Sequence, residues 1–470
     1  SMFVPKYGHN KDHYLPYPFS IGYSSALLKR DLDAEIKAVD ACALDFDEKE
    51  FLAYVKKYSP DVLVIEIPTI SFPLMIEVLR EIKNLLGCHI IVTGSHVTAF
   101  AQKIIEKYPF IDFCLLGEYE VTLRELLNKL LLSRTDYDDM KKIDGIAFHY
   151  CGEVIVNKRR NILKNLDSLP FPDMDDLPVK YYHDFEIAGK PTVNILSSRG
   201  CPFSCSFCLQ RHVIYASPLY RKRNPVKVVD EMEFRKEKYG AKQMYFDDDT
   251  MTVDKEHLNL ICQEILKRKV DIPWGCMGDI TLDYKILNLM SKAGCIGIKF
   301  GVESVNPKIL KSVTKGFVKI EKVKQFVKWC KNLGLWTHAT YIVGLPNDNK
   351  ETALATLKFA IDLDTDSAQF SIATPFPGTP FYEYCKNNGW IVTDNWSRYD
   401  GNNYSVVTYP WFTRDEIEET YRAVKATWEQ RMLKKYLKNP RRVIRYIKGK
   451  GIVYSAKKLR EILFSRFMSY

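Results

Sequence analysis

The sequence lacks any apolar run long enough to cross a membrane. Its longest runs, such as residues 62–65, fall far short of the roughly 18 apolar residues that a membrane span needs. Residues 3–18 are polar, aromatic and proline-containing, so we expect no signal peptide. Internal repeats and low-complexity tracts are also absent. With 46% hydrophobic and 27% charged residues, the composition excludes wholesale disorder, and we expect a soluble cytoplasmic protein.

Excess positive charge is confined to one end of the chain. The 470 residues include 68 Lys and Arg against 58 Asp and Glu, which gives a net charge of +10. Residues 431–470 contain thirteen basic side chains and one acid, Glu461, so the remaining 430 residues sum to −2. Basic and apolar residues interleave at helical spacing over 441–448 and 457–466. Such helices dock by their apolar face, lie on anionic lipid, or bind phosphate-rich substrate or nucleic acid.

Twelve cysteines are present, and three of them are close together. Because the others are scattered and most lie in apolar segments, we expect buried thiols rather than a disulfide framework. Cys201, Cys205 and Cys208 form a C-x3-C-x2-C loop directly after a predicted strand. Three thiolates in so short a loop can bind three irons of a cubane cluster and leave the fourth iron open. A structural zinc site, the alternative, needs four ligands, and His212 is the only nearby candidate for the fourth.

Strand-like and helical segments alternate along two parts of the chain, which predicts an α/β protein. Residues 1–135 have the pattern of a flavodoxin- or Rossmann-like parallel sheet, and 136–188 that of a hairpin and a proline-rich linker. Residues 189–390 predict a partial (β/α)6 TIM barrel, and 391–470 a helical, basic region. The strands of the first sheet are predicted at 34–39, 62–67, 89–92 and 113–116. Those of the barrel are predicted at 193–197, 243–247, 272–276, 297–302, 338–343 and 368–374.

Ligands of open parallel sheets bind beyond the carboxyl ends of the strands. In the first sheet the corresponding loops are 66–69, 93–96 and 117–120, which are short and rich in small residues. This composition suits close backbone approach to a bulky ligand. In the barrel, the acidic run 247–249 ends the second strand, and it is either a ligand contact or a solvated loop.

Polar residues also share the inner face of the later barrel strands. By strand alternation Lys299, Gly301 and Glu303 lie on one face. A lysine inside a barrel is costly unless it is paired, so we expect Lys299 to contact a ligand or to pair with Glu303. The next two strands supply further candidates for substrate contact, and a core role remains open for the histidine. These candidates are His338, Thr340 and Gln369.

The cysteine loop, with Phe207 before its last cysteine, resembles the signature of the radical S-adenosylmethionine (SAM) superfamily over about residues 190–385. The resemblance implies a [4Fe–4S] cluster on Cys201, Cys205 and Cys208, and an open iron that binds the amino and carboxylate groups of SAM. It also implies cleavage of SAM to a 5′-deoxyadenosyl radical by an electron from a flavodoxin- or ferredoxin-type donor. The implied SAM contacts are Phe207, Asp248, Asp249, Lys299, Glu303, Ser304, Ile342 and Gly344.

Two positions depart from this pattern. Asn347-Asp348 follows the stretch 341–346 where the superfamily usually has Gly-Glu. Asp279 stands where relatives often have an arginine, so the usual partner of the SAM carboxylate is absent there. This second departure makes Lys299 our candidate for the carboxylate partner.

The loops of the first sheet resemble those of the cobalamin (B12)-binding domain that is fused to many radical SAM enzymes. The similar stretches are 21–22, 93–98 and 116–120, and they continue through 144–146 and 169–172. No D-x-H-x-x-G sequence occurs, so we expect a cobalt without a histidine ligand; a sheet that binds no cofactor is the alternative. The implied cobalamin contacts are Ile21, Gly22, Thr69, Gly94, Ser95, His96, Thr98, Gly117 and Glu118.

The chain is therefore identified as a member of the cobalamin-dependent radical SAM enzymes. We expect C-methylation of an unactivated carbon in a small-molecule or lipid-like substrate, with ring formation or rearrangement as the alternative. A transfer RNA methylthiotransferase would carry three further cluster cysteines and a carboxyl-terminal β-barrel, and a non-catalytic iron–sulfur or cobalamin carrier is a third hypothesis. Because relatives include lipid- and pigment-modifying enzymes, we expect peripheral membrane contact through the basic tail and no nucleic-acid partner.

Overall fold

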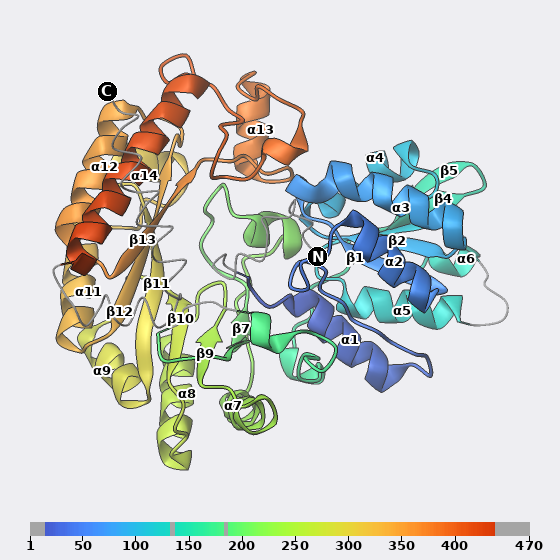
Figure 1. Ribbon diagram of the computed structural model, residues 1–470, viewed down its shortest axis with the longest axis horizontal. Helices are drawn as coiled ribbons and strands as arrows, with labels where there is room; N and C mark the ends of the chain where they lie inside the picture. Colours follow the sequence, from blue (N-terminus) through green and yellow to red (C-terminus); the bar gives the residue numbers. More distant parts are fainter. Residues whose placement is uncertain (1–14, 132–136, 183–186, 438–470) are drawn as a thin grey trace.

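Two sheets built from βα units occupy separate halves of the protein (Figure 1). The computed structural model describes residues 15–131, 137–182 and 187–437. The basic segments 441–448 and 457–466 lie outside the described residues. No helix in the described part of the chain is long and apolar enough to span a membrane.

The first half contains a mixed sheet of five strands in the order β1-β2-β3-β4-β5. The first three strands are parallel, and the last two form a hairpin that joins antiparallel to β3. The strands are β1 (Val62–Glu66), β2 (His89–Thr93), β3 (Phe113–Leu115), β4 (Ile146–Tyr150) and β5 (Glu153–Val156). The helices are α1 (Phe19–Asp31), α2 (Glu48–Tyr58), α3 (Phe72–Leu86), α4 (Ser95–Lys107), α5 (Glu120–Leu130) and α6 (Tyr137–Met140).

One expectation for this half was wrong. Residues 34–39 form no strand, because the amide of Ala38 donates to a carboxylate oxygen of Asp176 (3.2 Å) and not to a neighbouring strand. The hairpin expected within residues 136–188 is present, and it extends the sheet: Phe148 of β4 pairs with Phe113 of β3, and their rings lie 5.8 Å apart. Burial of these apolar side chains on one face of the sheet explains the extension.

The second half is a partial barrel of six parallel strands in the order β13-β12-β11-β10-β9-β6. Each predicted barrel strand is present, and no strand end differs from the prediction by more than two residues. The strands are β6 (Thr192–Ile195), β9 (Gln243–Phe246), β10 (Trp274–Gly278), β11 (Cys295–Glu303), β12 (Trp336–Val343) and β13 (Ser367–Ile372). The outer helices are α7 (Pro225–Tyr239), α8 (Lys255–Arg268), α9 (Tyr284–Lys292), α11 (Ile320–Asn332) and α12 (Lys350–Leu363).

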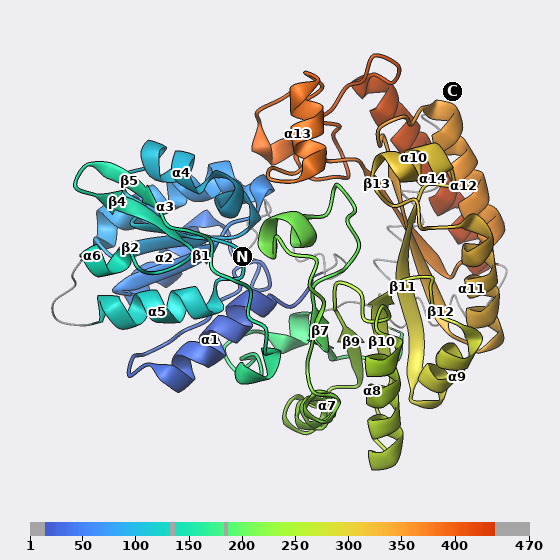
Figure 2. The same cartoon turned by 180° about the vertical axis from the view of Figure 1, so that it is seen from behind.

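Short elements at the mouth of the barrel lie between the two halves. The short strands β7 (Ser198–Arg199) and β8 (Arg221–Lys222) pair with each other, and the segment between them, green in Figure 1, reaches toward the first half. Figure 2 shows α10 (Pro307–Ser312) and α13 (Pro380–Asn387) at the same end of the molecule. Helix α14 (Arg414–Leu437) packs against α12 and β13 on the outside of the barrel.

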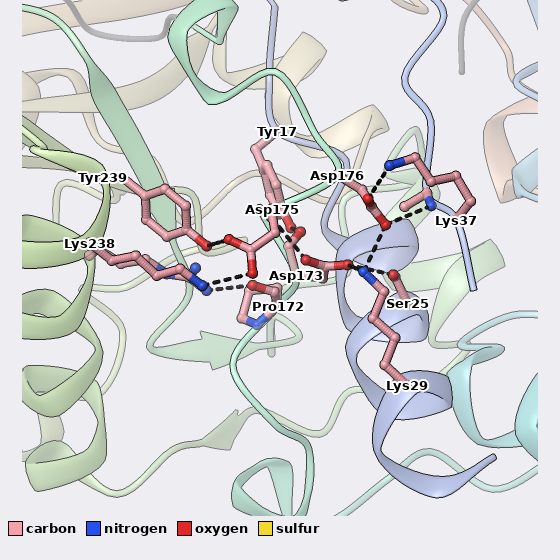
Figure 3. Close-up of polar contacts among 12 residues, drawn as sticks. Tyr17, Ser25, Lys29, Lys37, Pro172, Asp173, Asp175, Asp176, Lys238 and Tyr239 are labelled. Carbon is pink, nitrogen blue, oxygen red and sulfur yellow. Dashed lines mark hydrogen bonds and ion pairs between the residues drawn. The ribbon is translucent and has the colours of Figure 1, made fainter. Parts of the chain in front are cut away.

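An acidic linker, residues 173–176, lies between the two halves, and its aspartates contact both of them (Figure 3). Asp173 accepts hydrogen bonds from Ser25 and Lys29 of α1, both at 2.6 Å. Asp175 accepts from Lys238 and Tyr239 at the end of α7, at 2.7 and 2.9 Å. Asp176 accepts from Lys29 and also pairs with Lys37. The linker thus joins the first helix of one half to the first long helix of the other.

Candidate functional site

A cavity of about 2310 Å³ lies between the two halves. Its walls come from the carboxyl-end loops of the first sheet, from the mouth of the barrel and from the carboxyl-terminal region. The first sheet contributes Glu66, Pro68, Thr69, Ile70, Ser71, Ser95, Glu118 and Glu120, together with much of segments 15–21 and 40–46. The barrel contributes Ser198, Arg199, Asp247, Asp248, Asp249 and Met277, and the carboxyl-terminal region contributes Tyr399, Tyr404, Tyr421, Arg422 and Lys425.

The cysteine loop lies beside this cavity. Its three thiols are free and partly exposed, and Leu209 and Gln210, which follow the last cysteine, line the cavity. Burial raises the pKa of Cys201 to about 12 and that of Cys205 to about 11, so both thiols stay protonated at neutral pH unless a metal binds them.

The three thiols fit the ligand set of a cubane cluster. Nowhere in the described part of the chain do three His, Cys, Asp or Glu side chains converge as ligands of a single ion. A cubane cluster does not require such convergence, because each thiolate binds a different iron. The imidazole of His212 instead lies 3.1 Å from the carbonyl oxygen of Cys205 through its Nε2 atom.

Segment 313–317, which follows α10, holds the cysteine loop in place. The amide of Ser206 donates to the carbonyl of Val313 at 3.1 Å, and the Thr314 hydroxyl donates to the carbonyl of Ser204. The rings of Phe203 and Phe317 stack 4.1 Å apart with an interplanar angle of 11°. These contacts cover three positions between the first and last cysteines, so the loop conformation depends on a segment more than 100 residues away in the chain.

Lys315 forms an ion pair with Glu303 inside the barrel mouth. The two side chains are 12% and 7% exposed, and Lys315 Nζ lies 2.6 Å from Glu303 Oε1. Burial lowers the pKa of Lys315, but Glu303 and Cys205 outweigh that effect and raise it. A Cβ on Gly301 would lie 2.2 Å from Glu303 Oε1 and 2.6 Å from Lys315 Nζ, so the glycine leaves the space that this pair occupies.

Of the two roles considered for Lys299, the ion pair with Glu303 is absent from the described part of the chain, and Glu303 pairs with Lys315 instead; contact of Lys299 with a ligand stays a prediction. Lys299 lies two residues before Gly301 on β11, and its Nζ lies 4.7 Å from the centre of the Tyr245 ring. Lys299 pairs in register with His338, and Gly301 with Thr340. The sequence analysis missed Lys315, since only the fold of the loop after α10 brings it to the site.

The two aspartates at the end of β9 line the cavity but differ in their contacts. Asp248 is 2% exposed and accepts hydrogen bonds from the amide and hydroxyl of Ser197 and from the Ser198 hydroxyl. Burial raises its pKa to about 6. Asp249 accepts from the amide of Gly200 at 2.7 Å. Both carboxylates thus hold the backbone that leads into the cysteine loop.

Other implied SAM contacts have partners within the protein. The Ser304 hydroxyl accepts from the amide of Asn306 at the start of α10, and Phe207 and Ile342 pack against the barrel core. Gly344 has a φ of +85°, and a Cβ there would lie 3.0 Å from Ile417 of α14. This glycine therefore permits the close approach of α14.

The inner-face candidates on β12 and β13 lie on neighbouring strands, and Thr340 pairs in register with Gln369. The imidazole of His338 lies 2.7 Å from the Ser367 hydroxyl through Nδ1, and it stacks with Trp336 at 5.9 Å. Burial, with a smaller effect of Lys299, lowers the pKa of His338 to about 3, so its ring is neutral at physiological pH. The Thr340 hydroxyl lies 3.4 Å from Glu303 Oε2, and Gln369 is exposed beside Thr340. None of these three candidates is among the residues that line the large cavity.

The structure divides the implied cobalamin contacts into two groups. Ile21, Thr69, Ser95 and Glu118 line the cavity. The hydroxyls of Thr69 and of neighbouring Ser71 are buried without a hydrogen-bond partner in the described structure, which suits acceptance of a polar ligand. The residues that line the cavity in the described structure include no histidine. The implied contacts that lie outside the lining are Gly22, Gly94, His96, Thr98 and Gly117.

Three of these outer residues have other neighbours. His96 packs against Phe72 and Trp396 at 4.2 and 5.0 Å, and burial lowers its pKa to about 4. A Cβ on Gly22 would lie 1.8 Å from the Tyr17 hydroxyl. Gly117 approaches the barrel, since a Cβ there would lie 2.8 Å from the carbonyl oxygen of Ile214.

A buried ion-pair cluster joins the loop after β3 to β7 and β8, the short strands that flank the cysteine loop. It consists of Glu118, Glu120, Arg199 and Arg221, whose side chains are at most 6% exposed. Arg199 lies 2.7 Å from Glu118 and 2.8 Å from Glu120, and Arg221 lies 2.7 Å from Glu118. Burial raises the pKa of Glu118, but the two arginines outweigh it and hold the pKa below its ordinary value. Glu118, implied as a cobalamin contact, thus forms ion pairs with Arg199 and Arg221 of the other half.

Comparison with known proteins agrees with this architecture. The B12 binding domain family matches residues 15–127, and the Radical SAM superfamily matches residues 195–360. An uncharacterized methyltransferase, PH0819 of Pyrococcus horikoshii, is 31% identical over 407 residues, which cover 86% of this chain and 86% of that protein. The anaerobic magnesium-protoporphyrin IX monomethyl ester cyclase of Cereibacter sphaeroides is 26% identical over 389 residues, 82% of this chain and 62% of that protein.

A solved structure has the same fold. The radical SAM methyltransferase TsrM from Kitasatospora setae, with cobalamin and a [4Fe–4S] cluster bound, superimposes with a TM-score of 0.66 at 20% identity, over 82% of this chain and 74% of that chain. This chain belongs to the radical SAM enzymes that carry an amino-terminal B12 binding domain. Its cofactors are accordingly a [4Fe–4S] cluster, SAM and cobalamin.

Proposed function

We propose that this enzyme methylates an unactivated carbon of a small-molecule substrate that binds in the cavity between its halves. The cavity is the observation that carries this proposal. Pockets for one drug-sized ligand occupy about 300–1,000 Å³, whereas this cavity occupies about 2310 Å³. It therefore has room for a large cofactor and a substrate together, between the loops of the first sheet and the mouth of the barrel.

The residues around the cavity suggest where each cofactor binds. We assign the cluster to Cys201, Cys205 and Cys208, and the carboxylate of SAM to Lys315, because this buried cation lies near the cysteine loop. Cobalamin would lie against Thr69, Ser71 and Ser95, at the carboxyl edge of the first sheet. When bound, these groups supply a 5′-deoxyadenosyl radical and a methyl group.

The protein's own side chains would orient these groups and limit water. Asp248 and Asp249 hold the backbone before the cysteine loop, and the buried ion-pair cluster holds the loop after β3 against it. Tyr404 of the carboxyl-terminal wall and Arg422 and Lys425 of α14 face the cavity and would read the substrate. The sequence analysis missed these three residues, because no motif marks them.

The first test is assembly of the cofactors and turnover of SAM. The protein is reconstituted anaerobically with iron, sulfide and cobalamin, and we expect a cluster signal by electron paramagnetic resonance after reduction, retained cobalamin, and 5′-deoxyadenosine formation. Cys205→Ala should abolish the cluster signal, whereas Cys151→Ala, at an exposed cysteine, should leave it unchanged. A protein that assembles no cluster is not a radical SAM enzyme.

The methyl transfer is tested with SAM that carries a trideuteromethyl group. Incubation with a small-molecule extract should give a product that carries the label, detected by mass spectrometry. Formation of 5′-deoxyadenosine without labelled product would contradict methylation. It would instead favour ring formation, the second candidate function, which the similarity to the cyclase of Cereibacter sphaeroides supports.

A lipid-like substrate and peripheral membrane contact form a finer proposal. The basic composition of residues 431–470 supports it, and most of that segment lies outside the described residues. Polybasic segments bind anionic lipid through electrostatic attraction. We expect the protein to sediment with vesicles that contain phosphatidylserine and not with neutral vesicles, and equal recovery with both would refute membrane contact.

A further inference from the structure

The segment that holds the cysteine loop is strongly basic. Between Glu303 and Glu321 the chain contains four lysines and no acid. Lys315 is buried against Glu303, whereas Lys308, Lys311 and Lys319 are exposed. None of these three exposed lysines forms an ion pair with an acidic side chain in the described part of the chain.

This basic surface, defined by Lys308, Lys311 and Lys319, belongs to the segment that contacts the cysteine loop. The chain between these lysines makes the contacts with Ser204 and Ser206 and supplies Phe317, which stacks on Phe203. Pro202 and Ser204, within the cysteine loop, are themselves exposed. A protein that docks here thus reaches the neighbourhood of the cluster without entering the cavity, since residues 305–320 do not line it.

We propose that this basic surface is the docking site of an acidic one-electron carrier protein. The inference rests on the proposed function, which requires a reduced cluster. On docking, the carrier loses one electron and the cluster gains it, and no bond forms or breaks. Exposed charges of one sign raise the rate of encounter with a partner of opposite charge. The rate of electron transfer also falls steeply with the distance between donor and acceptor, which favours a docking site beside the cluster.

The test measures binding of a flavodoxin, as a representative acidic carrier, to the reconstituted enzyme. In the variant Lys308→Glu/Lys311→Glu/Lys319→Glu we expect at least a tenfold higher Kd at low ionic strength. The matched control, Lys285→Glu/Lys328→Glu/Lys358→Glu, makes the same charge change at exposed positions on α9, α11 and α12, and its Kd should change less than about twofold. Added salt should reduce the difference, because exposed charges are screened beyond about 10 Å at 0.1 M salt.

Two reductants separate docking from the chemistry. Reduction of the cluster by flavodoxin should slow at least tenfold in the Lys308 variant, while reduction by photoreduced 5-deazariboflavin, a small uncharged reductant, should not change. A zero-length carbodiimide crosslink in the unmodified enzyme should join carboxylates of flavodoxin to Lys308, Lys311 or Lys319, as mapped by mass spectrometry.

Each outcome decides the proposal. Equal weakening in both triple variants, no weakening in either, or crosslinks confined to other lysines would overturn the docking site. Those results would leave the proposed function intact if deazariboflavin still supports formation of 5′-deoxyadenosine. Failure of the unmodified enzyme to assemble a cluster would instead refute the proposed function.

Discussion

At the scale of single residues, the ion pair between Lys315 and Glu303 is the feature that most changes the interpretation of the site. Asp279, where relatives often have an arginine, accepts hydrogen bonds from Thr252 and from the amide of Thr281, so it has a structural role. Lys315 brings a cation to the barrel mouth from a loop. Lys299, on the inner face of β11, lies over the ring of Tyr245 instead.

We predict that Lys315→Met weakens SAM binding much more than Lys299→Met does. The loss of a charge-assisted contact to a carboxylate costs about 1.5–3 kcal/mol, or roughly 10- to 150-fold in affinity. The Kd of SAM is measured by isothermal titration calorimetry on the reconstituted enzyme, with cluster content as the check on assembly. A larger effect of Lys299→Met would restore Lys299 as the carboxylate partner.

His96 gives a pH-dependent prediction at the same scale. Its pKa is about 4 in the folded protein and 6.5 when unperturbed, since burial against aromatic rings disfavours the charged ring. The unfolded chain therefore binds more protons between pH 6.5 and pH 4, and the contribution of His96 to stability is lost as the pH falls through this window.

The variant His96→Phe should remove that contribution. Between pH 7 and pH 5 we expect the free energy of unfolding of the natural protein to fall by about 2 kcal/mol more than that of the variant. Urea denaturation at the two pH values measures the difference. Parallel changes in both proteins would show that His96 does not titrate as its burial indicates.

At the scale of elements, the buried ion-pair cluster joins the loop after β3 to the paired short strands β7 and β8. Its two glutamates come from the first half and its two arginines from the second, so neither half forms the cluster alone. Arg199 directly precedes Gly200 and the first cysteine. The position of the cysteine loop relative to the first sheet therefore depends on Glu118 and Glu120.

We predict that Glu118→Gln destabilises the protein by about 3–5 kcal/mol, because it leaves two buried guanidinium groups with Glu120 as the remaining carboxylate of the cluster. The control Glu77→Gln removes an exposed pair with Arg80 and should cost no more than about 1 kcal/mol. Chemical denaturation measures both. Equal effects would mean that the buried cluster contributes no more than a surface pair.

Three parts of the chain show where sequence patterns succeed and fail. The six barrel strands were predicted nearly to the residue, because continuous apolar runs between amphipathic helices favour buried parallel strands. Residues 34–39 have a similar local pattern but form no strand, since Asp176 of the distant linker binds the amide of Ala38. The hairpin β4–β5 could not be assigned to a sheet from the sequence, because 30 residues separate the end of its pairing partner β3 from the start of β4.

At the scale of the whole molecule, the acidic linker sets how the two halves meet (Figure 3). Asp173 contacts α1 through Lys29, a side chain that Asp176 also contacts. Because the cavity lies between the halves, weaker contacts of the linker with α1 should also weaken the binding of a cofactor in the cavity.

We predict that Asp173→Asn/Asp176→Asn increases the rate of limited proteolysis several-fold, with cleavage near the linker, and weakens cobalamin retention. The rate of cleavage follows the population of opened states, which rises tenfold for each loss of about 1.4 kcal/mol in the free energy of opening. The control Asp230→Asn removes a pair with Arg268 inside the barrel half and should leave the linker resistant. Equal cleavage in both variants would show that the linker does not hold the halves together.

The sequence by itself determined the two βα series and the cysteine loop, because apolar periodicity and ligand spacing are local properties of the chain. It also marked residues of the first half that line the cavity, among them Ile21, Thr69 and Ser95. Only the tertiary structure decided that Lys315 pairs with Glu303, that Glu118 binds two arginines of the barrel, and that α14 forms a cavity wall. These contacts join residues far apart in sequence, so their energies depend on how the two sheets pack and no local pattern records them.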